Sequence, residues 1–399
     1  MTDTATRFGA AARVDWPLDP AVVYLNHGTV GVTPRRVMAA QQAIREEIER
    51  QPAAFILRGL NAAITVGGAS GETPRLRRAA NEVAAFLGAR GDDLVFTDNI
   101  TSGANAVLRS YPLEAGDEIL VADLGYGGVT QAANFAARQA GAVMREVRLP
   151  WPGATPESVA DAWEAAVGPR TALASVDHVT ADSALVLPLA EIAARLRARG
   201  VAVLGDGAHA PGAIPVDIPA LGVDWYAANL HKWLWVPRSS GILWAAPARQ
   251  EGLHPPVISW GLDQGFTAEF DAPGTRDPSA FLSAPTAIAL MRELGVEAVQ
   301  AYNHALAWDG AHLLASRWGV PFDTPEWMIG TMATVPLPPR LGGADADASR
   351  VRDALLFDQG IEVKTFAFRD ACYARISGQV YNDLADVERL ADAVTRLGV

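Results

Sequence analysis

The sequence contains very little cysteine and very little lysine. Cys372 is the only cysteine among 399 residues, which excludes an internal disulfide and any zinc site built on several thiolates. Lys232 and Lys364 are the only lysines, and every other residue in the Lys plus Arg total of 33 is an arginine. Chemistry that needs a primary amine on a side chain therefore has two candidates.

Long apolar runs and positive charge are also missing. No run approaches the roughly 18 to 20 apolar residues of a membrane span, and residues 1–13 lack a basic segment followed by an apolar one. The formal net charge of −12 disfavours binding to nucleic acid or to anionic lipid, which both need a positive surface. We therefore expect a cytoplasmic protein whose partners are a small molecule and a second copy of itself.

What the sequence does contain is an alternation of strand and helix patterns. Half of the residues are apolar and a fifth are charged, as in ordered globular proteins. Strands separated by helical segments predict a parallel sheet with crossover helices on both faces, hence an α/β fold. The predicted strands are 93–97, 118–122, 172–179, 201–204, 224–228 and 241–245, and the helices between them are 101–109, 131–139 and 187–199.

The remaining segments predict three parts of the chain. We expect an N-terminal arm over 1–21, a large α/β domain over 22–285 and a small α+β domain over 286–399. The large domain should begin with a short strand at 22–25, followed by a helix that Thr33 caps. The small domain should contain strands at 332–335 and 373–376 and a final helix at 383–397.

Two polar residues follow apolar strands at the edge where parallel sheets bind ligands. Asp206 comes directly after Val-Ala-Val-Leu-Gly, and Lys232 comes a few residues after the strand 224–228. Alone, they can be read as a turn residue and a surface amine. Lysine is, however, rarely surrounded by large apolar residues such as Trp233 and Trp235 without a reason. A buried carboxylate that keeps a pyridine nitrogen protonated, together with an amine, predicts pyridoxal 5′-phosphate (PLP) chemistry.

A phosphate group needs a helix N-terminus with small or hydroxylated residues. The turn Asn99-Ile-Thr-Ser-Gly103 offers this arrangement, with Thr101 and Ser102 at the start of a helix that follows a strand. An ordinary helix cap has the same sequence pattern, so both interpretations stay open.

Several separate motifs, in a fixed order, carry a family resemblance. They are Tyr24-Leu-Asn-His-Gly28, Asp123-Leu-Gly-Tyr126-Gly127, Asp206-Gly-Ala-His209, Asn229-Leu-His231-Lys232, Gly274-Thr-Arg-Asp-Pro-Ser279, Arg375-Ile-Ser377 and Tyr381-Asn382. Through them the sequence resembles the class V aminotransferase family of fold type I PLP enzymes, and within it the isopenicillin N epimerase-like proteins. The likeness extends from about residue 22 to about residue 385.

The resemblance implies a role for each matching residue. It implies that Lys232 binds the cofactor covalently and that Asp206 faces the pyridine nitrogen, with His209 close to the ring and Tyr126 stacked on the face opposite the lysine. The phosphate would be held by the backbone of Ile100 and by Thr101, Asn229 and His231, and by Gly274 and Thr275 of the neighbouring subunit of a homodimer.

On the substrate side, the resemblance assigns the α-carboxylate of an amino acid to Arg375. A planar guanidinium forms two parallel bonds to a carboxylate and so orients the bond at Cα. Without the resemblance, Arg375 would be interpreted as a solvated arginine on an edge strand. Asn26 and His27 should line the substrate pocket from the N-terminal segment.

Two positions depart from the family pattern. Relatives that desulfurate cysteine need a nucleophilic cysteine on a loop, whereas Cys372 lies three residues before Arg375 in a predicted strand, so persulfide chemistry is disfavoured. Ala181 stands where many members have an asparagine that contacts the ring hydroxyl. Thr180 or Ser183 would have to replace that contact.

The sequence therefore predicts an enzyme that acts at Cα of an amino acid, but it does not select the outcome. We rank an epimerase first, a carbon–sulfur or related lyase second and an aminotransferase third. For epimerisation, Tyr126 or a histidine would be the second acid or base. The remaining alternatives are a binding module derived from this fold and a cofactor-free hydrolase, but no Gly-x-Ser-x-Gly, His-Glu-x-x-His or Gly-x-Gly-x-x-Gly motif is present.

Overall fold

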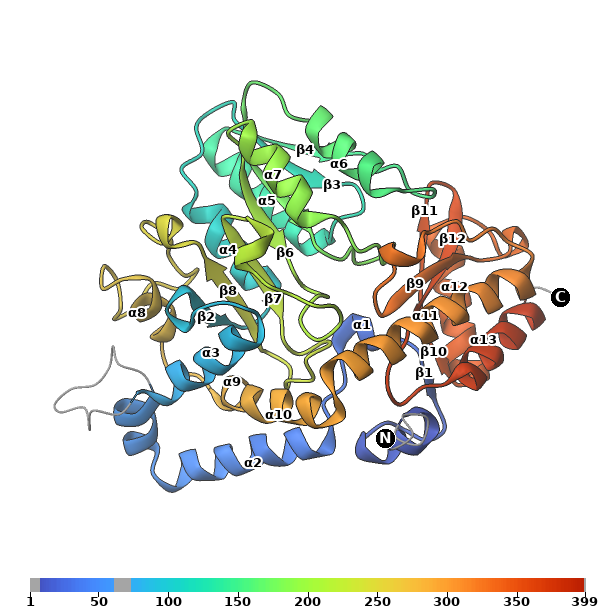
Figure 1. Cartoon of the computed structure of the whole chain (residues 1–399), viewed down its shortest axis with the longest axis horizontal. Coiled ribbons are helices and arrows are strands. Elements are labelled where there is room, and N and C mark those ends of the chain that lie inside the picture. The colour runs from blue at the N-terminus through green and yellow to red at the C-terminus, as the bar shows by residue number, and fades with distance from the viewer. Residues whose placement is uncertain (1–7, 61–72, 398–399) are drawn as a thin grey trace.

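The main body of the chain is a seven-stranded sheet covered by helices (Figure 1). The computed structural model of the chain describes residues 8–60 and 73–397. The strands lie in the order β2-β8-β7-β6-β5-β3-β4, and all neighbours are parallel except β8, which is antiparallel to β2 and β7. The predicted mostly parallel sheet is thereby confirmed. The strands are β2 Leu94–Thr97, β3 Glu118–Ala122, β4 Val143–Val147, β5 Thr171–Asp177, β6 Ala202–Asp206, β7 Trp225–Asn229 and β8 Gly241–Ala245.

The central strands are apolar along their length because both faces of the sheet are buried. In β6, Val203 packs into one core and Leu204 into the core on the other face. One face is covered by α4 Ile100–Ser110, α5 Gly127–Ala140 and α8 Phe266–Asp271. The other face is covered by α3 Arg75–Phe86, α6 Pro156–Ala165, α7 Leu189–Ala198 and α10 Ala284–Leu294.

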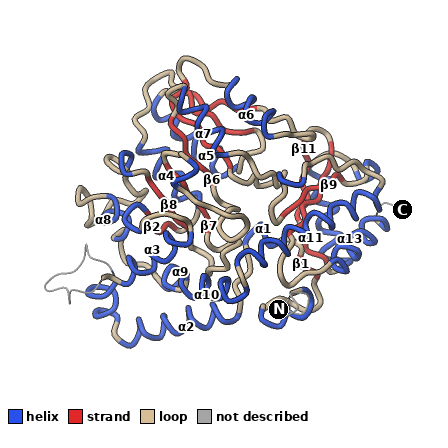
Figure 2. The backbone as a smooth tube through the Cα atoms, in the orientation of Figure 1, coloured by secondary structure: helices blue, strands red, loops and turns tan. Residues whose placement is uncertain are grey.

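A second group of strands lies apart from the first, with loops between the two groups (Figure 2). It is an antiparallel sheet in the order β11-β12-β9, with strands β9 Met332–Pro336, β11 Lys364–Phe368 and β12 Ala371–Ser377. The helices packed against it are α11 Val296–Trp318, α12 Asp345–Gln359 and α13 Leu384–Arg396. Because α11 contributes Val299 to the core of the large sheet and Leu306 to that of the small sheet, one helix belongs to both cores. The boundary near residue 285 stays a prediction.

The N-terminal segment contacts both cores, since Trp16 packs in the core of the large sheet and Val23 in that of the small sheet. After a 3-10 helix at Gly9–Asp15, β1 Val23–Tyr24 pairs in parallel with β10 Ile361–Glu362. The short helix α1 His27–Val30 follows directly. Residues 1–7 of the predicted arm lie outside the described residues. None of the helices in the described ranges is long and apolar enough to cross a membrane.

The expected cap of the next helix is wrong by one residue. The helix α2 Arg35–Arg50 has Pro34 at its N-cap in an extended conformation, and no side chain caps it. Proline fixes its own backbone angle and needs no N–H partner at this position, so the helix begins without the hydroxyl of Thr33. The helical segments Ala53–Leu60, of the π type, and α9 Ser279–Leu282 complete this side of the molecule.

Candidate active site

A cavity of about 340 Å³ opens where strands of the large sheet end and the small sheet begins. Its volume is within the range of small-molecule sites, about 300–1,000 Å³. The large sheet contributes the ends of β5, β6 and β7 and the start of α4, while α1 and the small sheet form the opposite wall. The lining residues that carry polar side chains are Thr29, Asn99, Thr101, Tyr126, Asp177, Asp206, His209, Asn229, His231, Lys232, Lys364 and Arg375.

Lys232 is buried, and its amine contacts a histidine. The Lys232 Nζ lies 3.0 Å from Nε2 of His209, whose Nδ1 accepts a hydrogen bond from Trp233 Nε1 at 3.4 Å. Since Nδ1 is an acceptor, neutral His209 carries its proton on Nε2 and donates it to the lone pair of the amine. Burial, and then the Arg375 cation, lower the pKa of Lys232 to about 7. The site thus favours the neutral, nucleophilic form of the amine.

Asp206 is the last residue of β6 and is fully enclosed. Its Oδ1 accepts the backbone N–H of Ala208 at 2.9 Å. Burial raises the pKa of Asp206 to about 6, and the bond from Ala208 and the charge of Lys232 oppose that shift. A cation placed beside this carboxylate would offset the cost of burying its charge.

A second carboxylate, which sequence reasoning missed, lies next to the first. Asp177 ends β5 directly opposite Asp206 of β6, and both line the cavity. Burial, and then the charge of Asp206, raise the pKa of Asp177 well above its usual range. The predicted strand 172–179 extends two residues beyond the end of β5. Asp177 was therefore placed inside the predicted strand instead of at its end. The available signal was that both carboxylates end buried apolar strands.

The start of α4 lies at one end of the cavity, as expected for a phosphate site, but its donors are partly used. Asn99 is the N-cap, and its Oδ1 accepts the N–H of Ser102 at 3.0 Å. The N–H of Ile100 is donated to Asn229 Oδ1 at 2.9 Å, so this predicted phosphate donor is already bound. The cap therefore belongs to Asn99, while Thr101, Asn229 and His231 line the cavity as predicted.

Two of the predicted site residues that do not line the cavity are Thr180 and Asn26. Thr180 is buried, its Oγ1 lies 2.7 Å from the Ser183 Oγ, and it accepts the N–H of Leu185 at 2.8 Å, so its hydroxyl stabilises its own loop. Neither Thr180 nor Ser183 lines the cavity, so their contact with the ring hydroxyl stays a prediction. The Asn26 amide donates to Glu362 at 2.7 Å, which directs this side chain to the β1–β10 pair.

His27 contacts the backbone of Lys232 and does not line the cavity. Its Nε2 lies 2.9 Å from the backbone carbonyl oxygen of Lys232, and its Nδ1 lies 2.8 Å from the Tyr381 hydroxyl. Burial lowers the pKa of His27 to about 3, so the ring is neutral. The structure assigns this histidine to the support of the Lys232 loop.

Tyr126 and the Gly274-Thr275 pair occupy more open positions. Tyr126 is the N-cap of α5, lines the cavity and is 42% exposed, which leaves its ring accessible. Gly274 and Thr275 are exposed and line a different depression, together with Leu57 and Trp260. Their predicted contact with the cofactor of a neighbouring subunit stays a prediction.

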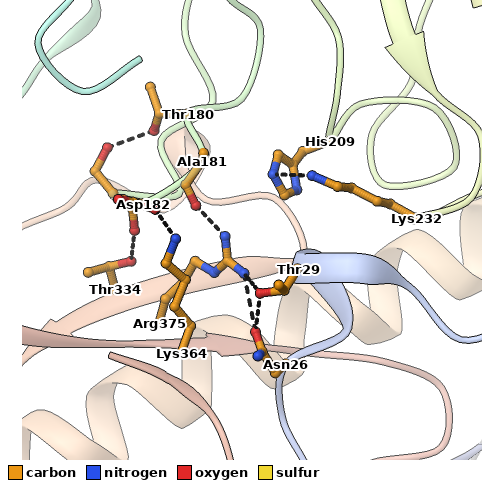
Figure 3. A network of polar contacts seen from close by, with 11 residues as sticks. Asn26, Thr29, Thr180, Ala181, Asp182, His209, Lys232, Thr334, Lys364 and Arg375 are labelled. Atoms are coloured by element: carbon orange, nitrogen blue, oxygen red, sulfur yellow. Dashed lines mark hydrogen bonds and ion pairs between the residues drawn. The ribbon is translucent and has the colours of Figure 1, made fainter. Parts of the chain in front are cut away.

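The substrate side of the cavity is formed by the small sheet (Figure 3). Arg375 of β12 is fully buried and donates hydrogen bonds to the Ala181 carbonyl oxygen and to Thr29 Oγ1 at 2.8 Å, with a longer contact of 3.4 Å to Asn26 Oδ1. The Nε of Arg375 has no partner among the described residues. A buried guanidinium with an unused donor fits an anionic ligand.

Lys364 of β11 is the other residue that sequence reasoning missed. It lines the cavity beside Arg375 and forms an ion pair with Asp182. Burial, and then Arg375, lower the pKa of Lys364. Its strand was not predicted, so nothing in the sequence pattern placed this lysine opposite Arg375.

Comparisons with known proteins find similar sequences over nearly the whole chain. The sequence profile of the family Aminotransferase class-V matches residues 68–390. The chain is 33% identical to isopenicillin N epimerase of Streptomyces clavuligerus over 95% of this chain and 96% of that protein. It is 30% identical to L-cysteine desulfhydrase of Arabidopsis thaliana over 94% of this chain and 88% of that protein.

Solved structures share the fold. The cysteine desulfurase of Thermococcus onnurineus NA1 superposes with a TM-score of 0.78 at 20% identity, over 98% of both chains. A variant of the lyase C-DES, with glycine covalently linked to its PLP-cofactor, superposes with a TM-score of 0.77 at 21% identity, over 96% of this chain and 99% of that one. The architecture is therefore that of the fold type I PLP-dependent enzymes.

Proposed function

Since the chain belongs to the aminotransferase class-V family, whose cofactor is pyridoxal 5′-phosphate, we propose that it is an epimerase acting at the Cα of an amino acid. The observation that carries this proposal is the meeting of Lys232, Asp206 and Arg375 in one cavity. These are an amine, a buried carboxylate and a buried guanidinium. The isopenicillin N epimerase relatives, at 33% and 34% identity over nearly the whole chain, favour this outcome.

The residues present fit the cofactor. Lys232 would hold it covalently, Asp206 would pair with the pyridine nitrogen, and the start of α4 with Thr101 and His231 would hold the phosphate. Bound PLP supplies an electron sink that stabilises negative charge at the substrate Cα. The low pKa of Lys232, about 7, allows its amine to accept and return a proton near neutral pH.

Arg375 would fix the orientation of the substrate through its α-carboxylate. The guanidinium is itself held by Ala181 and Thr29, so it reaches the ligand already positioned. His27 and His209 fix the lysine from the backbone side and the amine side respectively. Arg375 and Lys232 are thus both held in position, and together they would direct proton transfer at Cα.

Inversion needs a second acid or base, and we assign that role to Tyr126. The two histidines of the cavity are used elsewhere, since His209 contacts the Lys232 amine and His231 Nδ1 lies 3.0 Å from the Ser240 carbonyl oxygen. Tyr126 lines the same cavity from the start of α5 and is accessible. Tyr126→Phe should abolish inversion and retain exchange of the Cα hydrogen from one enantiomer.

A carbon–sulfur lyase is the second candidate, which the L-cysteine desulfhydrase relatives favour, and an aminotransferase is the third. Persulfide-forming desulfuration is disfavoured. Cys372 is buried in β12, its Sγ lies 3.6 Å from the Ala344 carbonyl oxygen, and burial raises the pKa of its thiol. It also does not line the cavity.

We further propose a homodimer in which Gly274 and Thr275 of each subunit complete the site of the other. Both residues are exposed beside Leu57 and Trp260, and an apolar surface of this kind is typical of an interface. Light scattering measures the molar mass of the active protein. A monomer that keeps full activity would contradict this assignment.

The function is tested with a panel of L- and D-amino acids in deuterated water, in which Cα-hydrogen exchange, keto acid, ammonia and thiol are followed together. Exchange with inversion alone supports the epimerase. Release of pyruvate or a thiol would replace it with the lyase, and an amino acceptor requirement would replace it with the aminotransferase.

A further inference from the structure

Two cations lie directly opposite each other on the substrate wall of the cavity. The antiparallel register pairs Lys364 of β11 with Arg375 of β12, and Arg375 with Thr334 of β9. Directly opposite residues point to the same face of a sheet, and like charges in such a pair destabilise it. Both side chains line the cavity, and Figure 3 shows them side by side. This arrangement needs a compensating negative charge.

The described residues provide only part of that charge. Asp182 forms an ion pair with Lys364, whereas the partners of Arg375 are a carbonyl oxygen, a hydroxyl and an amide oxygen. No carboxylate within the described residues lies within ion-pairing distance of Arg375. The wall therefore holds two positive charges and one negative charge, and one further anion would balance it.

Hydrogen-bond donors remain available for that anion. The Lys364 ammonium has three donors, of which Asp182 takes one, and the buried Nε of Arg375 has no partner among the described residues. Building on the proposed function, we propose that Lys364 and Arg375 bind the substrate α-carboxylate together, with Asp182 as the counter-ion of Lys364. Lys364 is thereby a second carboxylate-binding residue.

A purely structural role for Lys364 makes a different prediction. The row of Lys364, Arg375 and Thr334 also holds the loop that contains Ala181 and Asp182, because Thr334 Oγ1 donates to the Asp182 carbonyl oxygen at 2.7 Å. If Lys364 only anchored this loop, removal of either member of the Lys364–Asp182 pair would weaken binding. If Lys364 binds the carboxylate, the two removals have opposite effects, since loss of Asp182 leaves the wall more positive.

The experiment compares propionate with propionamide as ligands of the PLP-loaded protein, with affinities measured by ligand-observed NMR. The variants are Lys364→Met and Asp182→Asn. Arg352→Met is the matched control, because Arg352 is a half-exposed cation of α12 that pairs with Asp353, outside the cavity. Neither ligand has an amino group, so the result does not depend on turnover.

We expect the parent to prefer propionate. Lys364→Met should weaken propionate binding about tenfold without changing propionamide binding, because a hydrogen bond to a charged group is lost. Asp182→Asn should tighten propionate binding about threefold, as expected for removal of one partly exposed charge. The Arg352→Met control should match the parent.

Equal changes for both ligands, changes of the same sign in the two variants, or a parent that does not distinguish the ligands would each overturn the proposal. If Lys364→Met does not fold, the change in propionate affinity of Asp182→Asn decides. Any result other than tighter propionate binding by that variant then refutes the proposal. Cα-hydrogen exchange judges the proposed function separately, so exchange can fail while Lys364 is confirmed, and the reverse.

Discussion

The two walls of the cavity fix their charged groups in different ways. On the large-sheet wall, Asp206 and Lys232 lie at or just beyond the ends of neighbouring strands, and neighbouring backbone or ring atoms hold each in place. On the small-sheet wall, Lys364 and Arg375 face the cavity from the open end of the β11–β12 hairpin and are held by a loop that follows β5 of the large sheet. The first wall is positioned mainly by strand ends and by residues nearby in the sequence, and the second by contacts between distant segments.

The two lysines give the sharpest test of this comparison. Lys232→Ala should remove covalent attachment of the cofactor and lower activity about a thousandfold or more. The other lysine that lines the cavity, Lys364, lies on the small-sheet wall and not beside Asp206. Lys364→Met should keep the attachment. Borohydride reduction followed by peptide mass analysis checks both, and a cofactor found on Lys364 would reverse the assignment.

The two buried carboxylates should differ next. Asp206→Asn removes the charge that would pair with the ring nitrogen and should lower kcat about a hundredfold. Asp177→Asn should cost less than about tenfold, because burial already favours the neutral form of that carboxyl. Equal losses in Cα-hydrogen exchange would show that the cofactor is held by the pair rather than by Asp206.

Lys232 should also change how the unfolding free energy of the cofactor-free protein depends on pH. Its pKa is about 7 when folded and 10.5 ordinarily, so between these values the unfolded chain binds the extra proton. The parent should therefore gain stability relative to Lys232→Met as pH rises from 7 to 10.5, by at most about 1.4 kcal/mol per pH unit. Denaturant unfolding of both proteins across this range measures the difference, and a constant difference would contradict a buried neutral amine.

The smallest effect on catalysis should come from His27, which supports the first wall from behind. His27→Phe leaves the Lys232 carbonyl oxygen and the Tyr381 hydroxyl without their buried partner and should cost about 2 kcal/mol of unfolding free energy. The KM for the substrate should change less than about threefold. A large rise in KM with unchanged stability would restore His27 to the substrate pocket.

Asp206 and Lys232 of the first wall could be predicted from the sequence, whereas Asp177 of the same wall and Lys364 of the second were missed. Asp206 and Lys232 follow strong apolar strands, so their place at the sheet edge was predictable from the pattern of one chain segment. Lys364 was missed because β11 was not predicted, and only the register of β11 against β12 places it beside Arg375. Asn26, His27 and Thr180 were assigned to the site by position in a motif, but their hydrogen bonds direct them to neighbouring protein groups.

The elements that were missed share a physical reason. β4 is an edge strand in which Val143 and Glu146 are exposed, so it lacks the continuous apolar run of a central strand. α12 has only three buried residues, Ala348, Val351 and Leu355. A weak apolar pattern follows from partial burial, which only the assembled fold reveals.

The pairing of β1 with β10 has a consequence for how the protein is made. Asn26 and Arg375, whose side chains are in contact, are separated by 349 positions. A ribosome adds residues from the N-terminal end, so the large sheet can assemble while its substrate wall has not yet been synthesised. Residues 23–30 therefore cannot form their contacts with the small sheet until that sheet has been synthesised. The substrate wall of the cavity is complete only near the end of translation.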